Sequence, residues 1–276
     1  MYTQVSTSLG QRIEVDVQAT STSKRFSAAR VHKAPGGNAS SRTLALRLAE
    51  TIEDRDAAGQ LLNRRYAWRG YGSEHQIPND ESHTTFIGLS DEQIVGTITL
   101  GVDSPQGLAV DAVFKDEIDR FRAAPGAQIC ELIKFAFETE LPDQQNLAML
   151  FHTVFLYGSQ NHSCTDLFIE VNPRHRRFYQ SMLGFTPVGD MRNNPSVDAP
   201  SQLMWLNVSD VAEKIASCRS GAGATRTRSL YSLFLSQTGE SIIKMRLQER
   251  KRSDCLRGHN LIERSLPDAS VGVGAR

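Results

Sequence analysis

The segment from Asp166 to Phe185, DLFIEVNPRHRRFYQSMLGF, constrains the fold more strongly than any other part of the chain. Leu167, Ile169 and Val171 occupy alternate positions, as on a buried strand. Pro173 cannot continue a central strand but suits the first turn of a helix, so the strand is expected to end there. The segment therefore predicts a strand, a sharp break, a short amphipathic helix and a Leu-Gly-Phe stop.

Three arginines, Arg174, Arg176 and Arg177, cluster at the start of this helix. Positive charge there opposes the helix dipole, which favours negative charge at an N-terminus. Such a cluster makes sense where an anion or an acidic partner docks. A solvated helix face explains the same residues without a partner, and the sequence leaves both interpretations open.

The pattern of strand, Asn-Pro, helix and FYQSMLGF resembles the C-terminal half of a GNAT-type acyltransferase. A longer ordered set narrows the resemblance to FeeM-type N-acyl amino acid synthases, relatives of the acyl-homoserine-lactone synthases, over residues 44–217. The other segments of this set are LRLAETIEDRDAAGQLLNRRYAWRGY, TTFIGLSDEQIVGTITLGVDS, LAVDAVFKDEIDRFRA and ICELIKFAFE. The resemblance implies an α/β fold of GNAT type, a mixed central sheet flanked by helices, in which a splayed strand pair forms the acyl cleft. It also implies transfer of a long-chain acyl group from an acyl carrier protein to the amine of an amino acid or similar small amine, giving an N-acyl amino acid.

The local patterns agree with such a fold. Strands are predicted over residues 44–49, 84–89, 94–101, 129–137 and 203–208, and helices over 51–66, 113–122, 147–157 and 210–217. Ser209 is expected to cap the last helix. Strands interleaved with helices, one hairpin included, predict a mixed α/β sheet.

The composition divides the chain into three parts. Residues 1–42 are rich in Ser, Thr, Gly and Ala and are expected to form a flexible leader, followed by the acyltransferase domain over 43–218. Residues 219–276 hold 11 Lys and Arg against 5 Asp and Glu, although the whole chain has no net charge. We expect a basic, poorly ordered extension there. Contact with acidic partners or with a membrane surface is the alternative.

Several classes of function are disfavoured. The four cysteines are scattered and have no metal-ligand spacing, so neither a disulfide framework nor a metal site is expected. The sequence shows no signal peptide and no apolar run long enough to span a membrane, which favours a cytoplasmic location. The basic residues of the extension are not interleaved with aromatic residues, so a nucleic-acid partner is not expected.

Acyl transfer to an amine requires that the attacking nitrogen lose a proton. Glu131 is the candidate base, or the residue that orients the amine, because it lies in the otherwise apolar strand ICELIKFAF. A carboxylate there is costly unless it is paired or functional. The resemblance adds weight, since the related synthases carry a glutamate in this strand. An ion pair with a helix arginine is the alternative.

Five further residues are expected to shape the acceptor pocket. By the resemblance, Arg64 and Arg65 match an arginine in the first helix of the lactone synthases, and Asp80 and Glu81 match the acidic loop after it. Lys134 replaces the arginine of a Glu-x-x-Arg pattern and should point to the opposite strand face from Glu131. An arginine is the natural partner for the carboxylate of an amino acid. Surface ion pairing, and a solvated lysine, are the alternatives.

The acyl donor is indicated by a missing motif. GNAT-type enzymes that use acetyl-CoA generally have a glycine-rich pyrophosphate loop before the helix at 147–157, but this chain has ETELPDQQN there. Three acidic residues and no glycine disfavour a diphosphate. We therefore expect no bound cofactor and an acyl carrier protein, whose phosphopantetheine thioester is the co-substrate. Because carrier proteins are acidic, Arg174, Arg176 and Arg177 are the candidate docking residues.

The helix after this loop is apolar on more than one face, which suits one wall of an acyl groove. We assign Phe135, Phe137, Leu150 and Phe151 to acyl-chain binding, with ordinary core packing as the alternative. Two other functions stay open. One is a non-catalytic regulator that binds acyl groups or carrier proteins on a GNAT scaffold, and the other is a CoA-dependent N-acetyltransferase.

Overall fold

The computed structural model describes residues 44–138, 144–220 and 229–249, together with the backbone of three short strands near the N-terminus. These strands are β1 (Gln4–Ser6), β2 (Arg12–Glu14) and β3 (Arg30–His32), which form a small antiparallel sheet. The rest of the predicted leader, and residues 250–276 of the predicted extension, lie outside the described residues.

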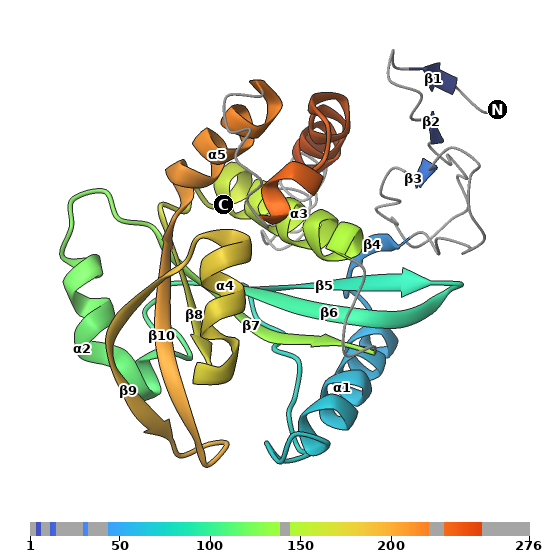
Figure 1. Ribbon diagram of the computed structural model, residues 1–276. Coiled ribbons are helices and arrows are strands. Elements are labelled where there is room, and N and C mark those ends of the chain that lie inside the picture. The colour runs from blue at the N-terminus through green and yellow to red at the C-terminus, as the bar shows by residue number, and fades with distance from the viewer. Residues whose placement is uncertain are drawn as a thin grey trace, which may run out of the picture.

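A seven-stranded sheet forms the centre of the molecule (Figure 1). Its strands, in spatial order, are β4 (Ala45–Leu48), β5 (His83–Ser90), β6 (Gln93–Val102), β7 (Ile129–Phe137), β8 (Asp166–Val171), β10 (Ala199–Asn207) and β9 (Thr186–Asn194). Every neighbouring pair is antiparallel except β7 and β8, which are parallel. A parallel pair needs a crossover connection, and α3 (Gln144–Asn161) supplies it.

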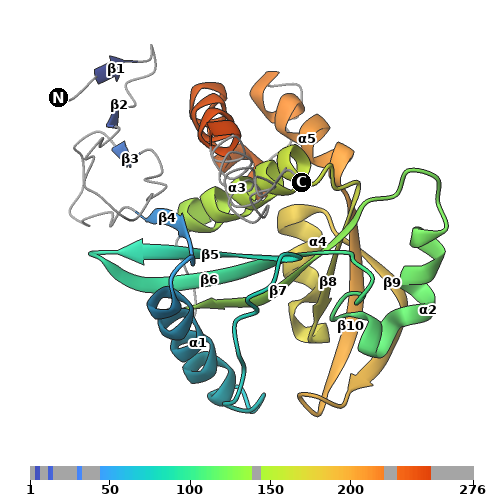
Figure 2. The same ribbon diagram turned by 180° about the vertical axis from the view of Figure 1, so that it is seen from behind.

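Helices cover both faces of this sheet, as the two opposite views show (Figures 1 and 2). One face carries α1 (Ile52–Ala67) and α2 (Asp111–Arg122), which pack over two small apolar clusters. The other carries α3, α4 (Arg176–Leu183) and α5 (Val208–Ser220), which enclose the largest cluster of buried side chains. The predicted mixed α/β sheet flanked by helices is therefore confirmed.

Local signals fix the ends of the elements near the break after β8. The Asn172 side chain caps the 3-10 helix η1 (Pro173–His175) by accepting a hydrogen bond from the Arg174 amide at 3.2 Å. Gly184 ends α4 with a φ of 79°, which a residue without a Cβ adopts readily. The break and the helix are those that the Asn-Pro and Leu-Gly-Phe signals predict.

The parallel strands β7 and β8 are splayed. They pair only over Ile129–Glu131, opposite Asp166–Phe168, and no pairing between them is present further along the two strands. Near the point of separation β7 has a bulge: its register with β6 shifts between Thr97 and Thr99, and Lys134 has a φ of 53°. Backbone groups on the inner edge of β7 are thereby freed from the ladder, and the predicted splayed pair is confirmed.

Two local predictions are wrong. The structure adds the edge strand β9, and α5 begins at Val208 rather than after Ser209. Asn207 caps this helix, because its Oδ1 accepts hydrogen bonds from the backbone nitrogen and the hydroxyl of Ser209, at 2.8 and 2.6 Å.

Part of the predicted extension also differs from expectation. Residues 229–249 contain the 3-10 helix η2 (Leu230–Leu233) and a helix over 237–249, which pack against α3. Phe234 stacks on His152 with ring centroids 4.7 Å apart, and Ile243 and Leu247 are buried. This segment completes the core because it covers the outer apolar face of α3. Among the described residues, no helix is long and apolar enough to cross a membrane.

Candidate functional site

The candidate site lies on the sheet face that carries α1 and α2. One row of paired residues crosses four strands there: His83 lies opposite Gly101, Gly101 opposite Glu131, and Glu131 opposite Phe168. Residues directly opposite each other point to the same face of a sheet. His83 and Glu131 are therefore neighbours across a glycine.

Glu131 is completely buried, and both of its carboxylate oxygens accept backbone hydrogen bonds. Oε1 accepts from the Ala109 amide at 2.7 Å, and Oε2 accepts from the Val110 amide at 3.1 Å. Burial raises the pKa of Glu131, and these two hydrogen bonds act in the opposite direction. The carboxylate thus anchors the loop that leads into α2. The sequence names Glu131 as the candidate base or the residue that orients the amine, and the structure shows both of its carboxylate oxygens engaged by backbone amides.

His83 is the functional candidate that sequence reasoning missed. Its Nδ1 lies 2.8 and 2.9 Å from the two carboxylate oxygens of Asp80, and the Ser82 hydroxyl donates to the same carboxylate at 2.6 Å. These hydrogen bonds, from Ser82 and then from His83, hold the pKa of Asp80 below its usual range. An aspartate three residues before a histidine, at the start of an apolar strand, was the available signal.

A cavity of about 280 Å³ lies beside this pair, at the edge of the sheet. β4 ends at Leu48, opposite Phe86, so the first residues of β5 extend beyond it. The cavity fills this edge, and its lining includes Asp80, His83, Thr84, Arg55 and Tyr157. Polar side chains therefore surround a space that a small substrate group can enter.

The two candidate arginines of α1 have different environments. Arg64 is exposed and forms an ion pair with Glu138 at 3.2 Å. Arg65 is half-buried and packs on Trp68, with its guanidinium carbon 5.4 Å from the ring centroid. Its Nε and Nη2 atoms are buried, and neither has a hydrogen-bond partner in the part of the chain that the structure describes. Arg65 therefore has two donors without a partner among the described residues, whereas Arg64 is engaged at the surface.

The other three candidates for the acceptor pocket also lie in different environments. Asp80 joins the site through His83, whereas Glu81 is exposed. Lys134 lies on the bulge of β7, so the regular alternation that predicted its direction does not hold there. It is half-buried; burial lowers its pKa, and the nearby charge of Glu131 acts in the opposite direction.

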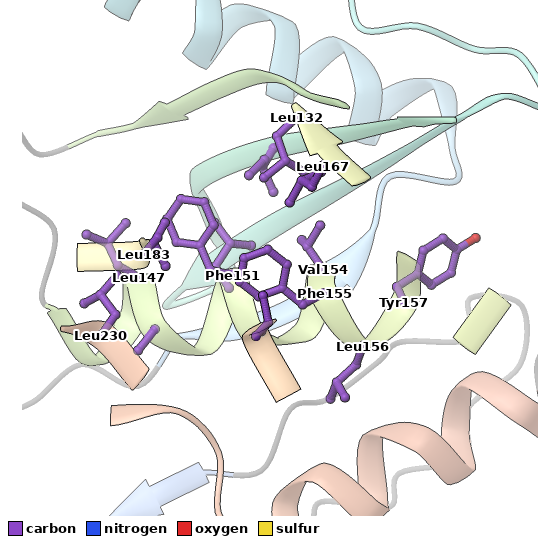
Figure 3. Close-up of a cluster of buried hydrophobic side chains, with 14 of the residues drawn as sticks. Leu132, Leu147, Phe151, Val154, Phe155, Leu156, Tyr157, Leu167, Leu183 and Leu230 are labelled. Atoms are coloured by element: carbon purple, nitrogen blue, oxygen red, sulfur yellow. The ribbon is translucent and has the colours of Figure 1, made fainter. Parts of the chain in front are cut away.

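The four acyl-chain candidates lie together on the opposite face of the sheet. The ring centroid of Phe135 is 5.8 Å from that of Phe137 and 5.5 Å from that of Phe151, and Leu150 is fully buried in the same cluster. Figure 3 shows Phe151 and Phe155 of α3 between the sheet and the elements that cover the helix. These side chains form an apolar wall between β7 and α3.

The three carrier-docking candidates occupy η1 and the start of α4. Arg174 is exposed and donates from Nη2 to the Tyr71 hydroxyl at 2.7 Å, which joins this segment to the turn after α1. Arg176 is half-buried and Arg177 is exposed. Arg69, near the end of α1, lies 5.9 Å from the Trp68 ring centroid. Basic residues from two parts of the chain thus share one side of the molecule.

A group of three or more side chains suited to hold a metal ion is not found within the described ranges. The site instead offers carboxylates, a histidine, an arginine and backbone amides freed by the splayed strands. This geometry is that of proton transfer and hydrogen bonding around a carbonyl group. Together with the splayed parallel pair and its bulge, it defines a GNAT-type N-acyltransferase.

Comparison with known proteins specifies the family. Residues 57–207 match the family model of N-acyl amino acid synthase FeeM, and the chain belongs to this family. The solved structure of FeeM, an N-acyl amino acid synthase from uncultured soil microbes, is 29% identical. The match has a TM-score of 0.55 and covers 62% of this chain and 94% of that chain.

Two further solved structures match over a similar share of the chain, with lower identities and TM-scores. The acyl-homoserine-lactone (AHL) synthase LasI is 13% identical, covering 60% of this chain and 91% of that chain, with a TM-score of 0.46. An N-acetyltransferase from Staphylococcus aureus Mu50 is 11% identical, covering 60% and 99%, with a TM-score of 0.40. No protein with a curated description matches the sequence significantly.

Proposed function

We propose that this N-acyltransferase moves a long-chain acyl group from the thioester of an acyl carrier protein to the amine of an amino acid. The observation that carries the choice of acceptor is the guanidinium of Arg65, whose buried Nε and Nη2 atoms lack partners in the described part of the chain. A buried donor left unpaired is unfavourable, so a ligand that pairs with it gains affinity. A carboxylate is the anion that an amino acid brings, and it pairs with a guanidinium through two parallel hydrogen bonds.

The position of Arg65 on α1 supports this role. It follows Leu61 and Leu62 by one helical turn, so it lies on the side of α1 that faces the sheet. Those leucines pack against Ala136 of β7, two residues beyond the bulge at Lys134. A carboxylate bound by Arg65 therefore lies beside the part of β7 that follows its pairing with β8.

The donor proposal rests on charge. The connection between β7 and α3 contains no glycine, and Glu138 at its start is exposed and paired with Arg64. Such a connection suits the diphosphate of CoA poorly. Arg177 and its neighbours instead offer positive charge to an acidic carrier protein. The apolar wall around Phe135 and Phe151 supports a long acyl chain over an acetyl group.

The test is an assay of the purified chain with dodecanoyl-acyl carrier protein and a mixture of the twenty amino acids, read by mass spectrometry. We expect one or a few N-dodecanoyl amino acids, and a much lower rate when dodecanoyl-CoA replaces the carrier thioester. Equal rates with the two donors would contradict the carrier proposal, and products from amines without a carboxylate would contradict the acceptor proposal.

Adjacent arginines provide a matched pair of variants. Arg65→Gln is expected to raise the KM for the amino acid about 10- to 100-fold, because a charge-assisted hydrogen bond contributes roughly 1.5–3 kcal/mol. Arg64→Gln removes the same charge one residue away and is expected to change KM by less than about threefold. Equal effects of the two substitutions would assign the loss to charge alone rather than to a bound carboxylate.

A further inference from the structure

We propose that His83, held in place by Asp80, is the general base that takes the proton from the attacking amine. This inference rests on the proposed function, because it requires an amine as acceptor. It assigns proton transfer to a residue other than Glu131, whose two carboxylate oxygens are occupied by the Ala109 and Val110 amides.

The first support is the orientation of the imidazole. Both carboxylate oxygens of Asp80 lie within 2.9 Å of His83 Nδ1, so the proton of the neutral ring is held on Nδ1. The Ser82 hydroxyl and the Ser82 amide both donate to Asp80 Oδ1, at 2.6 and 3.0 Å, which fixes the carboxylate in turn. Nε2 is therefore left with a free electron pair. A base that a third group orients is a recurring arrangement in acyl-transfer enzymes.

The second support is the direction in which Nε2 points. A Cβ placed on Gly101 would lie 3.2 Å from His83 Nε2 and 3.2 Å from Glu131 Oε1. The unprotonated nitrogen and the buried carboxylate therefore face the same small space above Gly101. Glu131 lies on the last paired row of β7 and β8, immediately before the strands separate. His83 thus faces the end of the splayed cleft, within reach of an amine there directly or through one water.

The third support is a route for the proton. The His83 side chain is 18% exposed and lines the cavity at the edge of β5, whereas Glu131 is completely buried. A base must release its proton before the next turnover, and His83 has contact with both the interior and the cavity. Glu131 does not reach the cavity. We assign it the role of holding the loop before α2 and of contributing negative charge.

The charged groups around His83 suit an imidazolium. Asp80 contacts the ring from its own segment, and Glu131 faces it from β7. Asp111 of α2 lies near Glu131, and Arg122 pairs with it at 2.7 Å, so this aspartate contributes little net negative charge. Glu50, between β4 and α1, and Arg55, in the first turn of α1, are charged residues of opposite sign in the cavity wall. The carboxylates nearest the ring stabilise the positive charge that forms when Nε2 takes a proton.

The reaction balances without a further reactant. His83 Nε2 first takes one proton from the ammonium group of the amino acid, and the resulting neutral amine attacks the thioester carbonyl carbon, so that a C–N bond forms. The C–S bond then breaks, and the thiolate of the donor leaves with the electron pair. The second proton of the nitrogen passes to this thiolate, directly or through solvent, and the imidazolium releases its proton to solvent, so the products are an amide and a thiol. Backbone amides freed at the bulge of β7 are suited to stabilise the oxyanion between these steps.

The test compares two acceptors in the full chain, with dodecanoyl-N-acetylcysteamine as the donor. The first acceptor is the amino acid that the wild-type chain acylates best, and the second is hydroxylamine, which is already neutral at neutral pH. We expect His83→Gln to lower kcat for the amino acid about 10²- to 10⁴-fold, with KM changed by less than about twofold. Its rate with hydroxylamine should stay close to that of the wild type. His175→Gln, at a histidine of η1 that does not line the cavity, is the control and should alter neither rate, because the small donor does not need the carrier-docking segment.

A second variant keeps the proposal testable if His83→Gln fails to fold. Asp80→Asn leaves the imidazole in place but removes the carboxylate that orients it. It should lower kcat for the amino acid about 10-fold or more, while the rate with hydroxylamine should not fall to the same extent. Added imidazole should restore part of the activity of His83→Ala.

The outcomes separate this inference from the proposed function. Wild-type kcat in His83→Gln, or an equal loss with both acceptors, would overturn the role of His83 while leaving acyl transfer intact. If the wild-type chain acylates another amine but no amino acid, the acceptor proposal fails and the same comparison is made with that amine. If it acylates no amine at all, both proposals are wrong.

Discussion

His83 Nε2 and Glu131 Oε1 approach the same position above Gly101, each to within 3.2 Å of where a Cβ would sit. The space exists only because Gly101 has no side chain. The row of residues that brings them together is defined by pairing across β5, β6 and β7. Two polar groups from distant parts of the sequence are thereby placed at one end of the splayed strands.

Gly101→Ala is expected to separate this pair. The added methyl group must push His83, Glu131 or both aside, because contacts of 3.2 Å are closer than carbon atoms normally tolerate. We expect a kcat at least about 10-fold below wild type and a destabilisation of roughly 1–3 kcal/mol. Steady-state kinetics and urea unfolding measure the two effects.

A glycine on the neighbouring strand gives the matched control. A Cβ on Gly88 of β5 would meet Leu44 at 3.0 Å, on the face that carries α3. Gly88→Ala should therefore destabilise the fold by a similar amount while leaving kcat per folded molecule near the wild-type value. A similar loss of kcat in both variants would show that general strain, and not the separation of His83 from Glu131, reduces activity.

The contrast between Glu131 and His83 shows what the sequence can predict. Glu131 is visible because a carboxylate interrupts an apolar strand, a purely local pattern. His83 opens its strand, and the aspartate three residues before it is a weak signal that many surface turns also carry. His83 becomes a candidate only because Gly101 and Glu131 lie beside it. These neighbours are brought together by the register of β5, β6 and β7. Register follows from long-range pairing, which a single sequence does not specify.

Other differences have the same physical origin. Arg64 and Arg65 are adjacent, so the sequence does not say which of them faces the sheet. The bulge at Lys134 adds one residue to β7 and ends the alternation that predicted its direction. β9 was missed because TPVGDMRNN is an edge strand, largely polar and with proline and glycine in it. The break and the short helix after β8 were predictable, since the Asn-Pro and Leu-Gly-Phe signals are local, whereas the splay of β7 from β8 was expected only from the resemblance to GNAT-type acyltransferases.

The segment 229–249 is expected to be required for stability. Phe234, Leu235, Ile243 and Leu247 are buried against the outer face of α3 and its neighbours. Each such side chain contributes about 1.5–3 kcal/mol when it is fully buried. A chain that ends after residue 228 should therefore lose at least about 5 kcal/mol, comparable with the whole stability of a domain. Solubility and urea unfolding provide the measurement.

A chain that ends after Glu249 is the control, because it keeps all of these contacts. It should unfold at the same urea concentration as the full chain. Ile243→Ala, which makes a cavity without removing the segment, should cost about 2–5 kcal/mol. Unchanged stability in the chain that ends after residue 228 would mean that α3 does not depend on this covering segment.

Arg177 is expected to contribute to the binding of an acidic carrier protein. It is exposed at the start of α4, and the structure gives it no ion pair within the described residues. Arg177→Gln should raise the Kd for an acyl carrier protein about two- to fivefold, mostly through a slower association that depends on ionic strength. Arg120→Gln removes an equally exposed charge from α2 and should have no such effect. Surface plasmon resonance at two salt concentrations separates the two variants.

His152 is expected to limit stability at acidic pH. The ring is buried, its Nδ1 accepts a hydrogen bond from the Leu235 amide at 3.0 Å, and burial lowers the pKa to about 4. Protonating Nδ1 would break that bond and bury a charge. Glu240 opposes the downward shift, whereas Arg219 and Lys244 add to it.

The direction of the pH effect follows from the two states. In the unfolded chain a histidine takes up a proton below a pH of about 6.5, but in the folded chain His152 does so only near pH 4. The unfolded state therefore binds more protons in this range, and stability falls as the pH falls from about 6.5 towards about 4. His152→Asn keeps an acceptor for the Leu235 amide but does not titrate. The free energy of unfolding of the wild type, relative to this variant, should decrease by up to about 3 kcal/mol between pH 7 and pH 4. A difference that stays constant across this range would show that His152 titrates alike in the folded and unfolded chains.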